Sequence, residues 1–110
     1  MNIKPLLKKT FEPMRCPAAP ISYKGEAAEY ITYMQYNELP ESASGKHYKE
    51  ATYGQATIWA DKPPSELVEE AIQRLRANGF KATRAAEGEN DELKKFYAVI
   101  DLWYENEVAG

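Results

Sequence analysis

The sequence is poor in the two residue types that build disulfides and many metal sites, with one cysteine, Cys16, and one histidine, His47. A single cysteine excludes an intramolecular disulfide, which is typical of a protein from a reducing compartment. No histidine or lysine lies close to Cys16 in the sequence to activate it, so we interpret its thiol as structurally incidental. His47 has no second ligand at metal-binding spacing, and we expect it to be exposed with no metal bound.

An excess of positive charge and a long hydrophobic run are also missing. The formal net charge of −3 disfavours a general nucleic-acid binder and attachment to an anionic membrane surface. No apolar run approaches the roughly 20 residues that a membrane-spanning helix needs. Residues 1–14 are too short and too interrupted by lysine for a signal peptide. We therefore expect a soluble cytoplasmic protein without specific nucleic-acid binding or membrane attachment.

The chain shows no recognisable catalytic pattern. The segment GQATIWADKPPSELVEEAIQRL contains no Ser/His/Asp arrangement, no metal-ligand spacing and no phosphate-binding loop. Asp101 falls on the polar side of an alternating strand pattern, which favours a solvated or interface charge over a catalytic carboxylate. The acidic run EGENDE lacks the ordered ligands of a calcium loop and is interpreted as a polar turn. We expect a protein that is not an enzyme and needs no cofactor.

The apolar content of the chain is sufficient for one small domain. Hydrophobic residues make up 44% of the 110 residues, which fits a single domain over residues 1–110. Apolar residues at helical spacing predict a short helix that begins near Asn2 and stops before Pro13, followed by an extended connector over residues 15–27. A second amphipathic helix is predicted over residues 65–78, because two prolines precede it and Asn78-Gly79 ends it.

Aromatic and β-branched residues predict four strands, over residues 29–37, 49–60, 80–85 and 96–105, with a polar loop over residues 38–48. The element order is α-β-β-α-β-β, which predicts an α+β fold: an antiparallel sheet of about four strands with two helices packed on one face. We expect the second helix and the sheet to share a core. Its predicted members are Leu75, Ile72, Phe96, Ile100 and Leu102.

Aromatic residues are the most informative excess, with eight tyrosines and two tryptophans. Aromatic strands on a basic protein would favour base stacking, but the negative net charge weakens that interpretation. Most of these rings are expected to fill the core of a small sheet. The remaining hypothesis is a subunit contact through rings on the less apolar strand faces, since aromatics are enriched at interfaces. The candidates are Tyr33, Tyr53, Trp59 and Trp103.

Three segments together carry a family resemblance: YITYMQYNE, then ATIWADKPPSELVEEAIQRLRANGF, and finally FYAVIDLWYENE. They resemble the phage tail terminator and head–tail joining proteins over roughly residues 30–105. In that family a strand that ends with a tryptophan leads directly into a Glu- and Ala-rich helix, a glycine-containing stop and a closing strand. The counterparts here are residues 57–61, 65–78, 79–80 and 99–104.

The resemblance implies a phage or prophage assembly protein without enzymatic activity or cofactor. Such proteins form a ring, typically hexameric, at the end of the tail tube. The implied partners are therefore further copies of the chain, the tail tube protein and the head connector protein. The implied location is the virion, and the host cytoplasm during assembly. The alternative is a small α+β regulatory or ligand-binding module, because similar helix-on-sheet folds serve many functions.

The loop over residues 38–48 is the second candidate contact region. It contains proline, glycine and serines, and its mixed charges suit polar contacts with a neighbouring subunit. Together with the rings, it defines the predicted interface with a subunit or partner. The predicted residues are Glu38, Glu41, Lys46, His47, Tyr48, Tyr53, Trp59 and Trp103.

Overall fold

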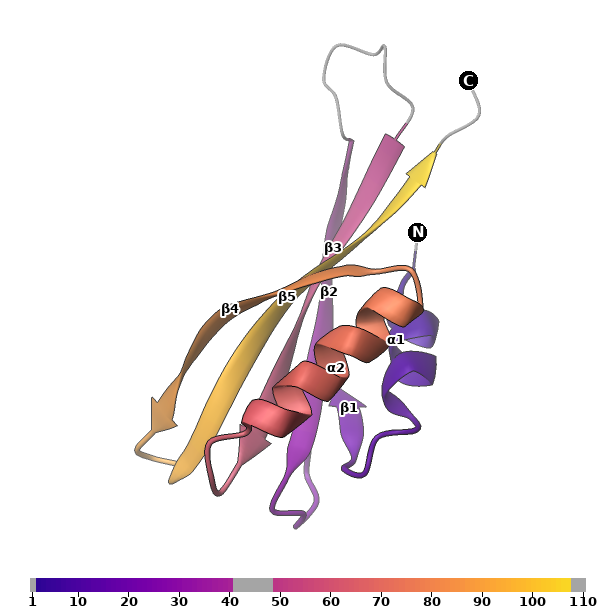
Figure 1. Ribbon diagram of the computed structural model, residues 1–110. Helices are drawn as coiled ribbons and strands as arrows, with labels where there is room; N and C mark the ends of the chain where they lie inside the picture. The colour runs from indigo at the N-terminus through magenta and orange to yellow at the C-terminus, as the bar shows by residue number, and fades with distance from the viewer. Residues whose placement is uncertain (1, 41–48, 108–110) are drawn as a thin grey trace.

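Alternating and helical hydrophobic patterns produce two helices and five strands in the computed structural model, which describes residues 2–40 and 49–107 (Figure 1). The α+β class expected from the sequence is confirmed. The elements and their bounds are α1 (Lys4–Phe11), β1 (Ala18–Pro20), β2 (Tyr30–Pro40), β3 (Lys49–Ala60), α2 (Ser65–Ala77), β4 (Lys81–Asn90) and β5 (Lys95–Glu107).

The strands form one sheet in the order β1-β2-β3-β5-β4. The four long strands pair antiparallel, as expected, but the sheet is mixed because β1 runs parallel to β2. The prediction of a purely antiparallel, four-stranded sheet was therefore wrong. The additional strand lies in the predicted extended connector, where Ile31 N–H donates to the Pro17 carbonyl and Ile21 N–H donates to the Tyr33 carbonyl. Three residues are too few to show the alternation that identifies a strand.

Strand β3 was predicted with its observed bounds, whereas three other strands are longer than predicted. Residues 38–40 belong to β2 instead of a loop, and their register partners are Thr52, Ala51 and Glu50. Residues 87–90 of the predicted acidic turn belong to β4, which pairs with the apolar strand β5. A polar edge strand held by an apolar neighbour has little hydrophobic pattern of its own, so sequence alternation underestimates its length.

Helix α2 matches its prediction closely and contributes an apolar stripe to the core. Asn78 follows its last turn, and Gly79 adopts a φ of 92°, a left-handed conformation that favours glycine at a helix end. The stripe consists of Leu67, Val68, Ala71, Ile72 and Leu75, all buried.

Helix α1 is fixed to the sheet at both of its ends. At its start, the Asn2 side chain accepts a hydrogen bond from Lys4 N–H, and Ile3 N–H donates to Gln35 Oε1 of β2 at 2.8 Å. At its end, the Phe11 ring lies 5.9 Å from the Tyr33 ring. Tyr33 is only 5% exposed, so the hypothesis that it contacts another subunit was wrong: α1 covers it.

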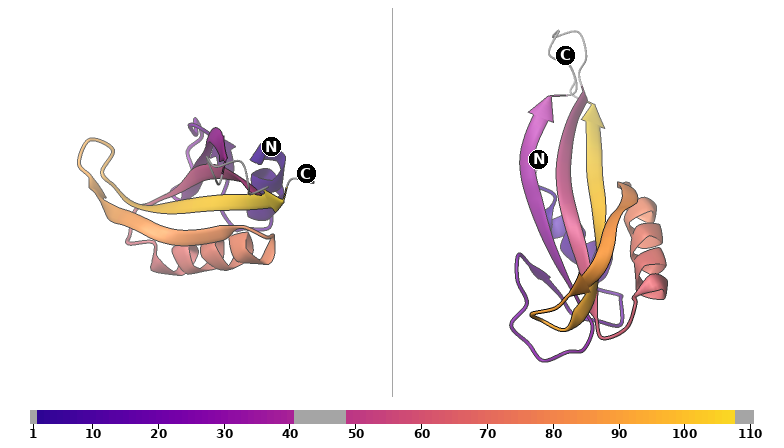
Figure 2. Two further views of the ribbon diagram at one scale, coloured as in Figure 1. Left: turned by 90° about the horizontal axis from the view of Figure 1, so that it is seen from above. Right: turned by 90° about the vertical axis from the view of Figure 1, so that its left-hand side faces the viewer.

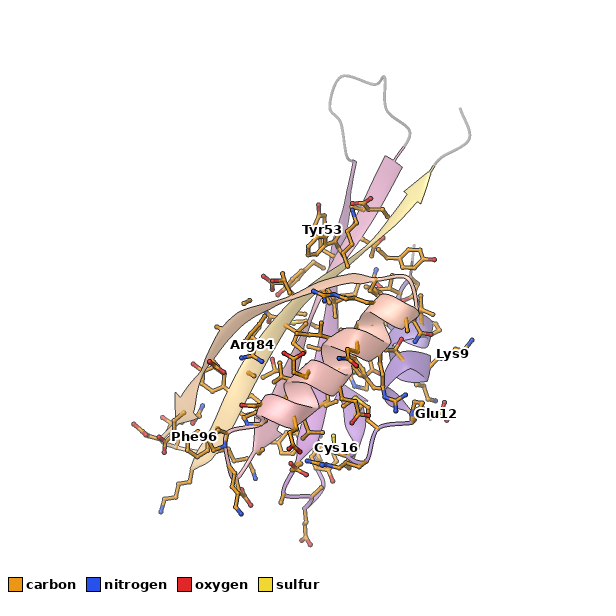
Figure 3. All side chains as sticks on the ribbon, in the orientation of Figure 1. Lys9, Glu12, Cys16, Tyr53, Arg84 and Phe96 are labelled. Atoms are coloured by element: carbon orange, nitrogen blue, oxygen red, sulfur yellow. The ribbon has the colours of Figure 1, made fainter. Side chains whose placement is uncertain are left out.

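Both helices pack on the same face of the sheet, as predicted (Figure 2). Ile100, Leu102, Ile72 and Leu75 are buried in the common core, in agreement with the sequence analysis. Phe96 was wrongly placed there: it is partly exposed and lines a recess beside Pro63 and Pro64, where α2 has only just begun. Figure 3 shows Phe96 at the end of the sheet where β4 and β5 are joined.

Gly54 in β3 lies where the neighbouring strands and the start of α1 leave no room for a side chain. A Cβ atom on Gly54 would lie 2.6 Å from the Met34 carbonyl oxygen and 3.0 Å from the Leu102 side chain. Next to this position β2 carries one extra residue between Gln35 and Glu38, which is the signature of a β-bulge. Glycine is therefore required where the bulged strand, β5 and the start of α1 converge.

Ile100→Ala tests the common core. Ile100 is fully buried, so we expect the substitution to lower the free energy of unfolding by about 2–5 kcal/mol. The matched control is Val99→Ala, because Val99 is the next residue on the same strand and points to the opposite face. Urea denaturation should show a clearly larger loss for Ile100→Ala; equal losses would contradict the assignment of the core face.

Candidate interaction surface

The sheet face opposite the helices is rich in aromatic side chains. Side chains alternate between the two faces of a strand, so the residues that flank the core positions of β2, β3 and β5 point away from α1 and α2. Among the described elements, no helix covers this face, which is turned toward the viewer in the right-hand view of Figure 2. We call it the bare aromatic face. It is defined by five partly exposed rings, those of Tyr30, Tyr53, Trp59, Tyr97 and Trp103.

Four rings form a continuous row near one end of this face. Tyr23 stacks on Tyr30 with centroids 4.6 Å apart, Tyr30 lies 6.2 Å from Trp59, and Trp59 lies 5.8 Å from Tyr97. The Trp59 indole N–H donates to Thr32 Oγ1 at 3.2 Å, which helps to fix the orientation of the central ring. The row is therefore held together by ring contacts and a hydrogen bond within the chain.

Lys95 lies at the same end of the row, and its positive charge is already paired within the chain. Lys95 Nζ lies 2.8 Å from Asp61 Oδ1, donates to the Ala28 carbonyl at 3.1 Å and stands 5.7 Å from the centre of the Tyr30 ring. Its charge is therefore satisfied within the chain. At this end of the bare aromatic face, the rings therefore lie beside a lysine whose charge is paired within the chain.

Two further rings lie toward the other end of the face. Tyr53 and Trp103 are register partners on β3 and β5, and their centroids are 6.4 Å apart. Figure 3 labels Tyr53 near the upper end of the strands. Together with Tyr36 of the β2 bulge, which is 42% exposed, they line a hollow of about 450 Å³ whose remaining wall includes Asp101 and Thr83.

The sheet edges are the second feature that a partner can use. β4 is a ten-residue edge strand, and β1 pairs with only three of the eleven residues of β2. Exposed strand edges can extend a sheet by pairing with another chain. Two exposed apolar side chains, Ile21 at 71% and Met34 at 39%, lie beside β1 and β2 and line one shallow depression.

The structure places three of the predicted interface residues, Tyr53, Trp59 and Trp103, on the bare aromatic face. Glu38 belongs to β2 and is the register partner of Thr52 on β3, so it does not begin a loop. Four further predicted residues lie outside the residues that the structure describes: Glu41, Lys46, His47 and Tyr48.

Sequence analysis missed Tyr30, Tyr36 and Tyr97 as members of this surface. The alternating pattern of the last strand already places Tyr97 on the same side as Trp103, opposite the apolar residues. The sequence analysis assigned Trp103 and Asp101 to that side of the strand and left Tyr97 out. Tyr36 could not be assigned in this way, because the bulge in β2 interrupts the alternation.

Cys16 and Asp101 are the two described residues that the sequence analysis considered for chemical activity. Burial raises the pKa of the Cys16 thiol, and the nearby Glu29 carboxylate adds to that effect. Asp101 is exposed on the bare aromatic face, which agrees with its interpretation as a solvated or interface charge. In residues 2–40 and 49–107, no cluster of three or more His, Cys, Asp or Glu side chains could hold a metal ion. Within these ranges no helix is long and apolar enough to cross a membrane.

Comparison with known protein-family models and with curated proteins finds no match for this sequence.

We expect Cys16 to react slowly with a thiol reagent in the folded protein. Its side chain is 7% exposed and burial raises its pKa, so little reactive thiolate is present at neutral pH. Labelling with a chromogenic disulfide reagent at pH 7 should be at least tenfold slower in buffer than in guanidinium chloride. Equal rates in the two solvents would show that the thiol is accessible and would contradict its structural interpretation.

Proposed function

We propose that this chain is a non-enzymatic assembly subunit of a phage or prophage virion, which forms a ring at the end of the tail tube and joins the tail to the head. The observation that carries the proposal is the bare aromatic face, with five partly exposed rings on a sheet whose other face is filled by two helices. The family resemblance of residues 30–105 supplies the biological setting. A hexameric ring, the tail tube protein and the head connector protein are the proposed partners.

The physical support is that a ring needs two different complementary surfaces on each subunit. Contacts between unlike surfaces generate a closed ring when the rotation between subunits closes. This chain offers an aromatic sheet face on one side and a helical, charged side on the other (Figure 2). Buried tyrosine and tryptophan side chains contribute most strongly to such contacts.

The charges on the bare aromatic face favour a protein partner over a nucleic acid. Lys81 pairs with Glu105 at 3.0 Å and Lys95 pairs with Asp61 at 2.8 Å, so the charges of these two lysines are already neutralised. Asp101 adds a negative charge. A stacking platform for single strands combines its rings with positive charge along the backbone path. Lys81 and Lys95 do not supply that positive charge, because each is paired with a carboxylate of its own chain.

A small ligand-binding module is the second candidate, and the hollow beside Tyr53 and Trp103 favours it. Its volume of about 450 Å³ falls in the range of small-molecule pockets, roughly 300–1,000 Å³. Its apolar rings and single carboxylate would suit an organic cation. This candidate predicts binding by a monomer, whereas the ring proposal predicts association that increases with concentration.

The ring proposal predicts that Trp59→Ala combined with Tyr97→Ala weakens self-association at least tenfold, because interface rings of this kind contribute 1–2 kcal/mol or more, on the order of a tenfold change each. Sedimentation velocity across concentration measures the association, and electron microscopy with tail tubes of the encoding phage shows whether rings sit at tube ends. Glu92→Ala, an exposed change in the turn between β4 and β5 and away from both proposed surfaces, is the control and should behave as the parent.

Two results would contradict the proposal. A permanent two-fold dimer that tail tubes do not alter would exclude a ring of unlike contacts. Unchanged association of the double variant, with an unchanged thermal melt, would remove the bare aromatic face from the interface.

A further inference from the structure

The hollow on the bare aromatic face combines aromatic rings with one carboxylate. Tyr36, Tyr53 and Trp103 supply the rings, and Asp101 supplies the charge. Tyr36 is 42% exposed and Asp101 is exposed, so both are accessible from solvent. The faces of aromatic rings attract cations, and a carboxylate beside them strengthens that attraction.

The charge of Asp101 is not balanced by the residues around it. Its register partners are Gln55 on β3 and Thr83 on β4, both uncharged. In the described part of the chain, Asp101 makes no ion pair, and Lys81 on the neighbouring strand is instead bonded to Glu105 at 3.0 Å. A carboxylate of this kind, next to three rings, is complementary to an organic cation with an apolar stem.

Helix α1 carries the complementary charge on the other side of the molecule. Lys4, Lys8 and Lys9 are exposed and form no ion pair within the described residues. They belong to α1, which packs on the sheet face opposite the bare aromatic face (Figure 2), and none of them lines the hollow of its own chain. Lys8 and Lys9 stand in the last turn of α1, where their charge also complements the helix dipole.

We infer that the hollow receives a lysine side chain from α1 of a second copy of this chain, so that Asp101 and its rings form the acceptor side of the subunit contact. The inference rests on the proposed ring, since it joins the helical side of one copy to the bare aromatic face of the next. The methylene stem of lysine packs on the rings while its ammonium group reaches the carboxylate. Each copy offers one acceptor and one donor, which is the requirement for a contact between unlike surfaces.

Charge reversal tests this contact. In Asp101→Lys, the new lysine faces the lysines of α1 of the neighbouring copy. In the double variant Lys8→Glu with Lys9→Glu, the new carboxylates face Asp101 instead. Each variant alone should therefore associate at least tenfold more weakly than the parent. In an equimolar mixture of the two variants, alternating copies restore an opposite-charge pair at every contact. Sedimentation velocity should therefore show the mixture returning to within about threefold of the parent's association constant.

Matched controls separate a local contact from a change in net charge. Glu92→Lys changes the net charge by the same amount as Asp101→Lys. Lys24→Glu with Lys62→Glu changes it by the same amount as Lys8→Glu with Lys9→Glu. All three control positions are exposed and lie outside the described ion pairs. These controls should associate as the parent does. Thermal melts within a few degrees of the parent would confirm that the variants are folded.

Three results would overturn the inference. If the parent forms rings and Asp101→Lys associates as Glu92→Lys does, the ring stands and this contact fails. If the mixture of the two variants does not recover, α1 is not the donor. If N-acetyl-lysine methylamide shifts the NMR signals of Trp103 in a monomer that never associates, the hollow is a site for a free organic cation. A parent that forms no ring, alone or on tail tubes, instead refutes the proposed function itself.

Discussion

The pairing of β3 with β5 is the constraint on which the rest of the structure depends. All twelve residues of β3 have register partners on β5, from Lys49 opposite Glu107 to Ala60 opposite Phe96. A shift of one residue would move every side chain to the other face. This register places Ile58, Ala98 and Ile100 under the helices, and it places Trp59, Tyr97 and Trp103 on the bare aromatic face. The core and the candidate interface are therefore two consequences of one alignment.

The bare aromatic face remains compatible with water because its rings cover one another. Tyr30, Trp59 and Tyr97 are all partly buried by ring contacts and cross-strand neighbours. Aromatic pairs contribute about 0.5–1.5 kcal/mol beyond the burial of their area, so the row stabilises the sheet of an isolated subunit. The same rings, held in place before a partner arrives, lose little conformational entropy on binding. In the proposed function, this surface stabilises the subunit and also forms the contact with its neighbour.

The sequence was sufficient to predict the elements whose pattern is local. The bounds of β3, the stripe of α2 and the burial of Ile100 follow from alternation, capping and helical spacing. It was insufficient where a long-range partner decides the outcome. β1 exists because β2 provides a parallel neighbour, and residues 87–90 are extended because β5 holds them. Tyr33 is buried because α1 folds back over it, which no pattern within β2 reveals.

The two sides of the sheet also limit which assemblies are possible. A two-fold dimer built on the bare aromatic face, with its axis close to the hollow, would bring two Asp101 carboxylates near one another. Joining unlike sides avoids that repulsion, since exposed lysines of α1 lie on the helical side. Contacts between unlike sides either close into a ring or continue as a filament, depending on the rotation between neighbours. In the proposed function, the end of the tail tube supplies the symmetric base that selects the closed ring. The charge pattern favours association between unlike sides, and the geometry of the partner decides how many subunits complete it.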